Sequence, residues 1–469
     1  MKSHKNEKIH FVGVGGVSMS ALAKFVAYAG GQVTGSDRER SATSVDLEKI
    51  FPVYYGEHPE IVDGCDKIIY SSAIAPDNLE MKRANELKIP TIERRDFLGQ
   101  IADLFERTVA VAGTHGKTTV TAMISHSLKK LDCNFSAHIG GETEYGNLIL
   151  CGNDIFVTEA CEYKKSLLSL NPHISVVLNA ELDHPDCYED MQSLLNVYLT
   201  FLEKGDIQVF TADFVDICKN EHMDISHYEK MATAVKNLEE KEILSKDDVI
   251  VFSNGKMKIW SKVKSRIIDG NPKMSVYENG GYSRDISLPD LDETTEQNAL
   301  VTMAVIDALG VAVDKGKDTL ATFKGVKRRR EFVGCLGGAK VVFDYAHHPT
   351  QIEKVVKAYK GKNLVVFQPH TYTRTRAYFD DFVSALSLAD KVLIMDTYGA
   401  RESAVDGADS ISLAEQISTI IAKDRVEYVK SADKTIECVI NAKNEFDNIL
   451  FLGAGDIYLL KGALAPYLK

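Results

Sequence analysis

Residues 109–119 read Val-Ala-Val-Ala-Gly-Thr-His-Gly-Lys-Thr-Thr, in which an apolar strand runs into a glycine-rich turn and then into a helical stretch. Glycines allow the backbone N–H groups of such a turn to face a polyphosphate. Lys117 can reach the outer phosphate oxygens, and the hydroxyl of Thr118 can bind Mg²⁺. Val111 stands where the common phosphate-loop pattern has its first glycine, and an ordinary strand-to-helix turn is the alternative. We predict a nucleoside triphosphate site made by Gly113, Thr114, His115, Gly116, Lys117, Thr118 and Thr119.

Short apolar strands and helical stretches alternate on both sides of this turn, which favours parallel sheets with crossover helices. At roughly 150 residues per domain, the 469 residues correspond to about three domains. We predict three α/β units over residues 1–106, 107–324 and 325–469. A strand at 249–252 is expected to continue the α/β order, whereas residues 213–242 are polar and predicted to be irregular.

The composition excludes several classes of protein. Lys and Arg number 55 against 67 Asp and Glu, a net charge of −12, which argues against nucleic-acid binding as the main task. No apolar run reaches the roughly 18 residues of a membrane span, and no signal peptide is recognisable, so we expect a cytoplasmic protein without a membrane partner. The eight cysteines form no Cys-x-x-Cys pair, so neither a disulfide framework nor a zinc site is indicated.

A second glycine-rich turn lies near the start of the chain, where residues 11–18 read Phe-Val-Gly-Val-Gly-Gly-Val-Ser. Such a turn places a pyrophosphate at a helix N-terminus, with Gly15, Gly16 and Ser18 around it. Asp37 follows the next strand and could bind a ribose. The alternative is that these glycines serve only tight packing of strand against helix.

Acidic residues and one histidine cluster directly after the predicted strand at 174–179, in the sequence Asn-Ala-Glu-Leu-Asp-His-Pro-Asp of residues 179–186. At the carboxyl end of a parallel strand, these groups would face a ligand crevice and could bind Mg²⁺. Glu159, just beyond the strand 155–158, could join them. A solvated loop is the alternative.

In the third unit, two strands end in histidines and arginines that supply local positive charge. Residues 343–349 contain His347 and His348, and residues 367–376 contain His370, Arg374 and Arg376. Asp344 could bind a ribose hydroxyl pair, although a packed turn is the alternative for such a histidine pair. Arg328 belongs to the basic stretch 327–330, which is either a solvated charge run or a clamp on a nucleotide.

Taken together, these segments resemble the Mur ligases over nearly the whole chain, in an order far more specific than any single motif. The segments that carry the resemblance are GVGGVSMSALA, SSAIAP, GTHGKTT, NAELDHPD, RRREF, DYAHHPT, FQPHTYTRT, YGARE and GAGDI. The resemblance implies an N-terminal Rossmann-like domain for a UDP-sugar, a central P-loop ATPase-type domain and a C-terminal Rossmann-like domain for an amino acid.

The resemblance also implies an activity, namely ATP-dependent ligation of L-alanine to the lactyl carboxylate of UDP-N-acetylmuramate through an acyl phosphate. By resemblance, Ser71 and Ser72 join Gly15, Gly16 and Ser18 around the UDP group. Thr118, Glu159 and His184 would hold Mg²⁺, with two ions expected, and Asn298, Arg328 and Asp344 would contact ATP. Lys117, His347, His370 and Arg374 are the candidate catalytic residues. The sequence leaves both a monomer and a homodimer open.

The chain departs from the family pattern in several places. Residues 159–164 read Glu-Ala-Cys-Glu-Tyr-Lys where Glu-Ala-Asp-Glu-Ser-Asp is common, and Thr294 and Thr295 replace a usual His-Asn. Thr371 stands where arginine is frequent. Leu199 lies near the place of a carbamylated lysine in related ligases, so no carbamate is predicted.

Three alternatives remain open. A ligase that recycles murein tripeptide onto the same UDP-sugar would share the ATP chemistry. An NAD-dependent oxidoreductase would use the first glycine-rich turn but would leave residues 113–119 unexplained. A nucleotide-gated binding protein would bind ATP without making an amide.

Overall fold

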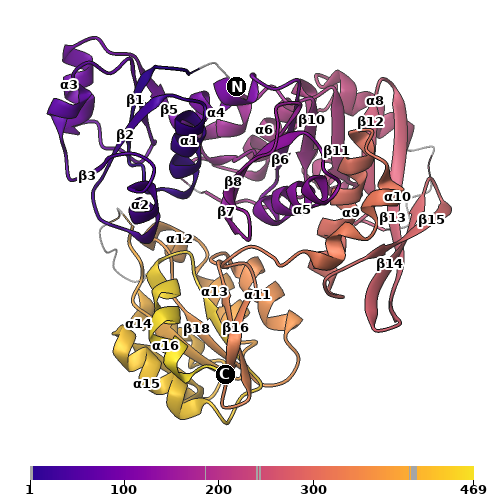
Figure 1. The fold of residues 1–469 in the computed structure, drawn as a ribbon. Coiled ribbons are helices and arrows are strands. Elements are labelled where there is room, and N and C mark those ends of the chain that lie inside the picture. Colours follow the sequence, from indigo (N-terminus) through magenta and orange to yellow (C-terminus); the bar gives the residue numbers. More distant parts are fainter. Residues whose placement is uncertain (1–3, 185, 239–240, 242–244, 401, 403–408) are drawn as a thin grey trace. The chain divides into compact units, whose positions relative to one another are not determined.

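The computed structural model describes residues 4–184, 186–238, 241, 245–400, 402 and 409–469. The chain forms three sheets and folds into two compact units, Met1–Asp183 with Cys187–Lys324, and His184–Asp186 with Gly325–Lys469 (Figure 1). Helices flank each of the three sheets, which confirms the predicted α/β class. The predicted boundary at residues 106 and 107 falls inside the first compact unit.

The first sheet is parallel throughout, as predicted, in the order β3-β2-β1-β4-β5. Its strands are β1 (Lys8–Val12), β2 (Gln32–Asp37), β3 (Val53–Tyr55), β4 (Lys67–Tyr70) and β5 (Thr91–Glu93). The helices of this part are α1 (Val17–Tyr28), α2 (Ala42–Leu47), η1 (Pro59–Val62), α3 (Leu79–Glu86) and α4 (Arg94–Ala102). Because all the strands run the same way, the turns after β1, β2 and β4 lie at one edge of the sheet.

The central sheet has ten strands in the order β15-β14-β13-β12-β11-β10-β6-β9-β7-β8. Its parallel strands are β6 (Arg107–Ala112), β7 (Phe135–Thr143), β9 (Ile155–Glu159), β10 (Ile174–Val177) and β11 (Ile207–Thr211). The antiparallel strands are β8 (Gly146–Leu150), β12 (Val249–Ser253), β13 (Lys256–Ile268), β14 (Asn271–Glu278) and β15 (Gly281–Ser287). The prediction that 249–252 continues the α/β order was therefore wrong, since this strand begins an antiparallel extension.

Two long helices, α5 (Lys117–Lys130) and α9 (Glu293–Ala308), lie side by side against the central sheet (Figure 1). The remaining helices are α6 (Met191–Lys204), α7 (Ala212–Asn220), α8 (Glu229–Leu238), α10 (Val313–Gly316), η2 (Tyr163–Ser169) and η3 (Thr319–Thr322). The prediction of irregular structure over 213–242 was wrong, because α7 and α8 fill most of it. Residues 239, 240 and 242 lie outside the described residues.

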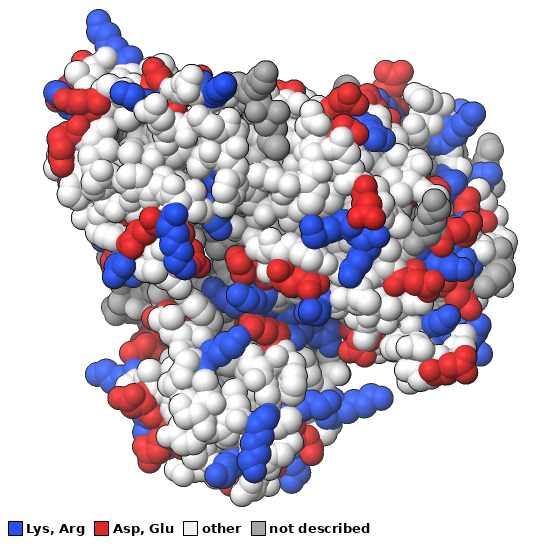
Figure 2. Space-filling model, viewed as in Figure 1, with Lys and Arg blue, Asp and Glu red and all other residues white. Residues whose placement is uncertain are grey.

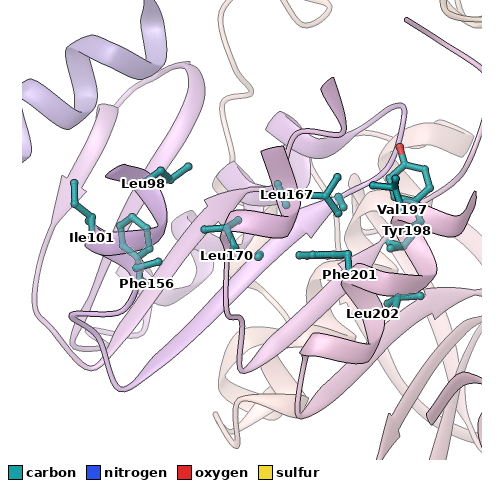
Figure 3. Close-up of a cluster of buried hydrophobic side chains, with 14 of the residues drawn as sticks. Leu98, Ile101, Phe156, Leu167, Leu170, Val197, Tyr198, Phe201 and Leu202 are labelled. Carbon is teal, nitrogen blue, oxygen red and sulfur yellow. The ribbon is translucent and has the colours of Figure 1, made fainter. Parts of the chain in front are cut away.

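The first and central sheets share a hydrophobic core (Figure 3). Leu98 and Ile101 of α4 belong to the same buried cluster as Phe156 of β9 and Phe201 of α6. Burying a leucine or phenylalanine side chain contributes about 1.5 to 3 kcal/mol. A continuous apolar core therefore fixes the glycine-rich turn after β1 relative to the strands of the central sheet.

The second unit contains a six-stranded sheet in the order β16-β17-β21-β18-β19-β20. Its strands are β16 (Glu331–Leu336), β17 (Ala339–Asp344), β18 (Asn363–Phe367), β19 (Lys391–Met395), β20 (Val426–Val429) and β21 (Asn448–Leu452), of which β16 alone is antiparallel to its neighbour. Its helices are α11 (Pro349–Ala358), α12 (Tyr372–Ala377), α13 (Phe379–Leu386), α14 (Ser410–Ile417), α15 (Ala432–Ala442), α16 (Leu460–Leu464), η4 (Lys423–Arg425), η5 (Asp456–Leu459) and η6 (Ala465–Tyr467).

Helices cover both faces of this sheet. One buried cluster packs α11, α13 and α14 against it, and a second packs α15 and α16. Ligands of such doubly wound sheets bind at the carboxyl ends of the parallel strands. Asp344, His370 and Tyr398 all lie at or just beyond such strand ends.

Among the described residues, no helix is long and apolar enough to cross a membrane. On the face shown in Figure 2, lysine and arginine side chains are interspersed with aspartate and glutamate.

Candidate active site

The phosphate turn connects β6 to α5 in the first unit. Gly113 has a φ of 130° and Gly116 has a φ of 87°. Residues other than glycine rarely adopt such positive φ angles. A Cβ on Gly113 would also lie 3.0 Å from the Cβ of Leu178. The N-terminus of the 14-residue helix α5 then begins at Lys117, which makes the turn a favourable place for an anion.

Asn179 holds the phosphate turn from the neighbouring strand. Its Oδ1 accepts a hydrogen bond from the backbone N–H of His115 at 2.8 Å, and its Nδ2 donates to the carbonyl of the same residue at 3.0 Å. The Thr114 hydroxyl donates to the Glu181 carbonyl at 2.9 Å, and His115 Nε2 lies 2.7 Å from Glu181 Oε2. The sequence places Asn179 at the end of a predicted strand, but its role in shaping the turn was not predicted.

Lys117 is paired with a residue that we did not predict, Glu162. Its Nζ lies 3.0 Å and 2.8 Å from the two carboxylate oxygens and also donates to the carbonyl of Gly113 at 2.5 Å. Burial alone would lower the pKa of Lys117, but the charge and hydrogen bond of Glu162, together with the electrostatic effects of Cys161 and Glu159, outweigh burial and raise it. The ammonium therefore stays charged at the place where the phosphate oxygens of ATP are expected.

Glu159 lies next to the phosphate turn, because the register of β9 on β6 sets it beside Val111. Its Oε1 accepts a hydrogen bond from the backbone N–H of Gly140 at 2.6 Å, which fixes the carboxylate. Thr118 lies in the first turn of α5 and is buried. A carboxylate and a hydroxyl are hard oxygen ligands of the kind that Mg²⁺ prefers, so these two residues fit the predicted ion.

The other predicted metal ligand, His184, is grouped with the second compact unit. It has a φ of 58°, which is uncommon for histidine. Its assignment as a ligand of Mg²⁺ stays a prediction.

Asn298 of α9 lies close to the phosphate turn. A Cβ on Gly116 would stand 3.2 Å from Asn298 Oδ1, and the side chain is largely buried. The departures at Thr294 and Thr295 fall in the first turn of α9, where both backbone N–H groups donate to Asp292 Oδ1 at 3.1 Å. These two residues therefore serve the helix cap.

In the first sheet, a hydrogen bond to the carboxylate of Asp37 holds the predicted diphosphate turn after β1. The backbone N–H of Gly15 donates to Asp37 Oδ2 at 2.7 Å, and Gly16 is the N-cap of α1. Ser71 Oγ accepts from Ala73 N–H at 3.2 Å, in a turn whose Ile74 packs near Gly13. The structure thus brings Gly15, Gly16, Asp37 and the Ser71–Ser72 turn to the same edge of the sheet.

The predicted catalytic residues of the second unit form one cluster. The ring of His347 lies 5.8 Å from that of His370, and His370 stacks on Tyr398 at 5.6 Å. An Arg374 N–H points to His370 Nδ1 at 3.5 Å. Tyr398, from the YGARE segment, was not assigned a role from the sequence. Arg401 of that segment lies outside the described residues.

Thr371, one of the departures from the family pattern, has strained backbone. Its φ is 66°, and its N–H donates to the carbonyl of Tyr398 at 2.9 Å. Such strain costs roughly 1 to 3 kcal/mol and is common at functional sites. The bond to Tyr398 ties the strained residue to the His370 cluster.

The side chain of Arg328 is packed against two tyrosine rings and is not a solvated charge. Its guanidinium lies between the rings of Tyr345 and Tyr458, at 4.8 Å and 4.3 Å, and donates to the carbonyls of residues 453–455. Asp344, at the end of β17, accepts from the N–H groups of Arg330 and Ala346 at 2.7 Å, and burial raises its pKa. The predicted contact of Arg328 and Asp344 with ATP stays a prediction.

Three family models match successive parts of the chain. Residues 8–106 match "Mur ligase family, catalytic domain", residues 111–268 "Mur ligase middle domain" and residues 328–455 "Mur ligase, glutamate ligase domain". A curated relative from Acetivibrio thermocellus, named UDP-N-acetylmuramate–L-alanine ligase, is 35% identical over 97% of this chain and 95% of its own.

Solved structures are similar over the same length. The UDP-N-acetylmuramate-alanine ligase of Thermotoga maritima is 25% identical with a TM-score of 0.75, covering 98% of both chains. A murein peptide ligase from Psychrobacter arcticus is 19% identical with a TM-score of 0.67 and the same coverage, which shows a shared fold.

Proposed function

The chain belongs to the Mur ligase family, and on that premise we propose that it joins L-alanine to the lactyl carboxylate of UDP-N-acetylmuramate with consumption of ATP, in the synthesis of peptidoglycan precursors. The observation that carries this proposal is the phosphate turn of residues 113–118 with Glu159 beside it. The identity of the sugar nucleotide and of alanine rests on the names of relatives that match along the whole chain. Both nucleotides are metabolites of the cytoplasm, where we place the reaction.

A carboxylate is a poor electrophile, so amide formation needs activation. A lactyl carboxylate oxygen attacks the γ-phosphorus of ATP, a new O–P bond forms, the bond to the bridging oxygen breaks and ADP leaves. The acyl phosphate has a good leaving group. The amine of alanine then attacks the acyl carbon, the C–N bond forms, inorganic phosphate leaves and the nitrogen loses its proton.

The first step requires that the negative charge on the phosphate oxygens be neutralised. Lys117 is buried, charged and placed at the N-terminus of α5, where it can transfer its contact from Glu162 to a phosphate. Thr118, Glu159 and His184 are the residues that we propose to hold Mg²⁺, in two sites. When bound, Mg²⁺ supplies positive charge to the oxygens of the transferred phosphoryl group.

The second step requires a base, and the hydrogen bonds favour His347 over His370. His347 Nδ1 lies 2.8 Å from the carbonyl of Tyr345, an acceptor, so the Nδ1 proton points there and Nε2 is the basic nitrogen. His370 Nδ1 instead lies 3.5 Å from Nη1 of Arg374, which is a donor only, so this nitrogen accepts in that contact. We propose that His347 accepts the proton, while Arg374 and His370 bind the carboxylate of alanine or the tetrahedral oxyanion.

Acyl phosphates hydrolyse in water, so the reaction also requires that solvent be excluded once the substrates are bound. Asn298, Arg328 and Asp344 are the proposed contacts of ATP, and Gly15, Gly16, Ser18, Asp37, Ser71 and Ser72 those of the UDP group. Two of these are buried polar side chains, Asn298 on α9 beside the phosphate turn and Asp344 at the end of β17.

The test incubates the protein with ATP, Mg²⁺ and UDP-N-acetylmuramate and screens single amino acids and the murein tripeptide for ADP release. ADP release with alanine supports the proposal, and release with tripeptide alone would favour the recycling ligase. Lys117→Ala should abolish ADP formation and leave binding of the UDP-sugar intact. Nicotinamide binding, or ATP binding without amide formation, would favour the oxidoreductase or the binding protein.

A further inference from the structure

The first turn of α1, which follows the predicted diphosphate turn, is held by polar side chains of the central sheet. Asn147 of β8 is buried, and its Nδ2 donates to the carbonyl of Val17 at 2.8 Å and to Ser20 Oγ at 3.0 Å. The hydroxyl of Ser18 lies 2.9 Å from Nε2 of His138 on β7. The β7–β8 hairpin therefore determines the position of the turn that we assign to the UDP-sugar.

His138 also contacts β9, the strand that ends at Glu159. Its Nδ1 lies 3.0 Å from Thr158 Oγ1 on β9, and this hydroxyl donates to the carbonyl of Glu159 at 3.2 Å. Two residues further along β7, Gly140 donates its N–H to the Glu159 carboxylate. One buried imidazole thus lies between the hydroxyl at the UDP-sugar turn and the strand end at the phosphate turn.

Both ring nitrogens of His138 have a hydroxyl partner, Ser18 Oγ at Nε2 and Thr158 Oγ1 at Nδ1. A hydroxyl group can both donate and accept, so either tautomer of the neutral ring finds an acceptor for its proton and a donor for its lone pair. Arg94 is a donor only, and its Nη1 also donates to Ser18 Oγ at 3.2 Å. A neutral imidazole therefore satisfies both hydroxyl partners.

We propose that His138 is a positioning residue of the ligase, which sets the UDP-sugar turn at Ser18 and the metal-binding end of β9 at Glu159 in one fixed geometry. This inference rests on the proposed function, because it gives His138 an effect on the proposed UDP-sugar site and on the proposed metal site. His138 acts through Ser18 and Thr158 and does not touch the reacting atoms.

The environment of the ring supports this role. His138 is buried, and burial together with the nearby charge of Arg94 lowers the pKa of His138 to about 3. The ring is therefore neutral across the working range of pH, so both hydrogen bonds persist. An apolar side chain of similar volume would fill the space and leave the hydroxyls of Ser18 and Thr158 without this partner.

Three variants separate positioning from simple support of the fold. His138→Leu should raise both the KM for UDP-N-acetylmuramate and the half-saturating Mg²⁺ concentration by about 5- to 10-fold, the usual effect of losing a buried hydrogen bond. His138→Gln, whose amide can accept and donate, should restore both values to within about 2-fold of wild type. Thr158→Val removes only the partner on β9 and should raise the Mg²⁺ requirement while leaving the KM for the UDP-sugar unchanged.

The control is His126→Leu. His126 is equally buried in α5 and also makes hydrogen bonds through both ring nitrogens, to Tyr145 Oη and to the carbonyl of Thr319. It should lower the unfolding temperature without changing either constant. If His138→Leu changes kcat or stability but neither the KM for the UDP-sugar nor the Mg²⁺ requirement, or if glutamine fails to restore both, the proposal is overturned.

Measuring the binding of UDP-N-acetylmuramate in the absence of ATP separates the test of the positioning role from the test of the proposed function. A wild-type protein that binds the UDP-sugar but ligates no alanine would refute the function, and the affinities of the His138 variants would still test the positioning role. Wild-type turnover with unchanged constants in His138→Leu would refute the positioning role alone.

Discussion

The Nζ of Lys117 lies 2.8 Å from Oε2 of Glu162, and little of either side chain is exposed. A buried ion pair of this kind is costly to break by removing one partner, because the other charge is left in a poorly solvated place. Lys117 is also the residue that we assign to the phosphates of ATP. Glu162 therefore balances the charge of Lys117 at the place where we propose that the phosphates of ATP bind.

The first prediction concerns Glu162→Gln. The substitution leaves the Lys117 ammonium buried without its counter-charge and should destabilise the protein by about 3 kcal/mol. ADP supplies negative charge at the same place, so it should raise the unfolding temperature of the variant more than that of the wild type. Thermal unfolding with and without ADP measures both effects.

Glu144→Gln is the matched control, because Glu144 pairs with Lys324 at 3.0 Å in a far more exposed place. It should change the unfolding temperature little, since exposed pairs contribute about 0 to 1 kcal/mol. An ADP-induced shift in Glu162→Gln that is no larger than in the wild type would contradict the assignment of Lys117.

A second prediction follows from the lowered pKa of His138. The unfolded chain takes up a proton near the ordinary pKa of 6.5, but the folded chain does so only at about 3. Protonation therefore favours unfolding, and stability should fall as the pH drops from about 6.5 towards 3, by roughly 1.4 kcal/mol per unit.

His138→Gln lacks this group and should lose roughly 2 kcal/mol less stability than the wild type between pH 7 and 5. The single tryptophan, Trp260, is fully buried in the first unit, and its fluorescence reports unfolding there. Parallel pH profiles for the two proteins would contradict a neutral, buried imidazole.

Glu159→Gln should raise the Mg²⁺ concentration needed for half-maximal ADP formation by at least about 10-fold, because a ligand charge is lost. His184→Ala should act in the same direction. Glu142→Gln on the same strand as Gly140 is the control, since Glu142 is exposed and has no assigned role. Superimposable Mg²⁺ titrations for wild type and Glu159→Gln would remove this residue from the metal site.

Arg328→Ala should destabilise the second unit by about 3 kcal/mol, because three backbone carbonyls lose a charged donor and two tyrosine rings lose a stacking partner. Lys327→Ala, from the same basic stretch but exposed, should have little effect. Thermal unfolding followed by circular dichroism compares the two. Equal unfolding temperatures would show that the packed geometry of Arg328 contributes nothing to stability.

Short stretches of sequence were enough to predict the strands and turns that hold the proposed site residues. The phosphate turn combines an apolar strand, two glycines and a helix within eleven residues, so short-range sequence sufficed. The segment 213–242 was misjudged because its helices are mostly polar. The signal was nevertheless present, since Met231, Ala234 and Leu238 recur at helical spacing and are buried on one face of α8.

Partners that are distant in sequence could not be predicted in this way. The antiparallel extension β12–β15 has apolar strands like those of a parallel sheet, and its direction depends on pairing with β11. Likewise, Glu162 and His138 are single polar residues whose partners lie 45 and 120 positions away. Their roles became visible only when the fold brought those partners together.

The most direct test of alanine ligation through an acyl phosphate uses UDP-N-acetylmuramate labelled with ¹⁸O in both oxygens of the lactyl carboxylate. The protein is incubated with this substrate, ATP, Mg²⁺ and L-alanine, and mass spectrometry is applied to the conjugate and the released phosphate. An acyl phosphate predicts an alanine conjugate that retains one ¹⁸O and inorganic phosphate that carries the other. Unlabelled phosphate, or release of ADP without the alanine conjugate, would contradict the account.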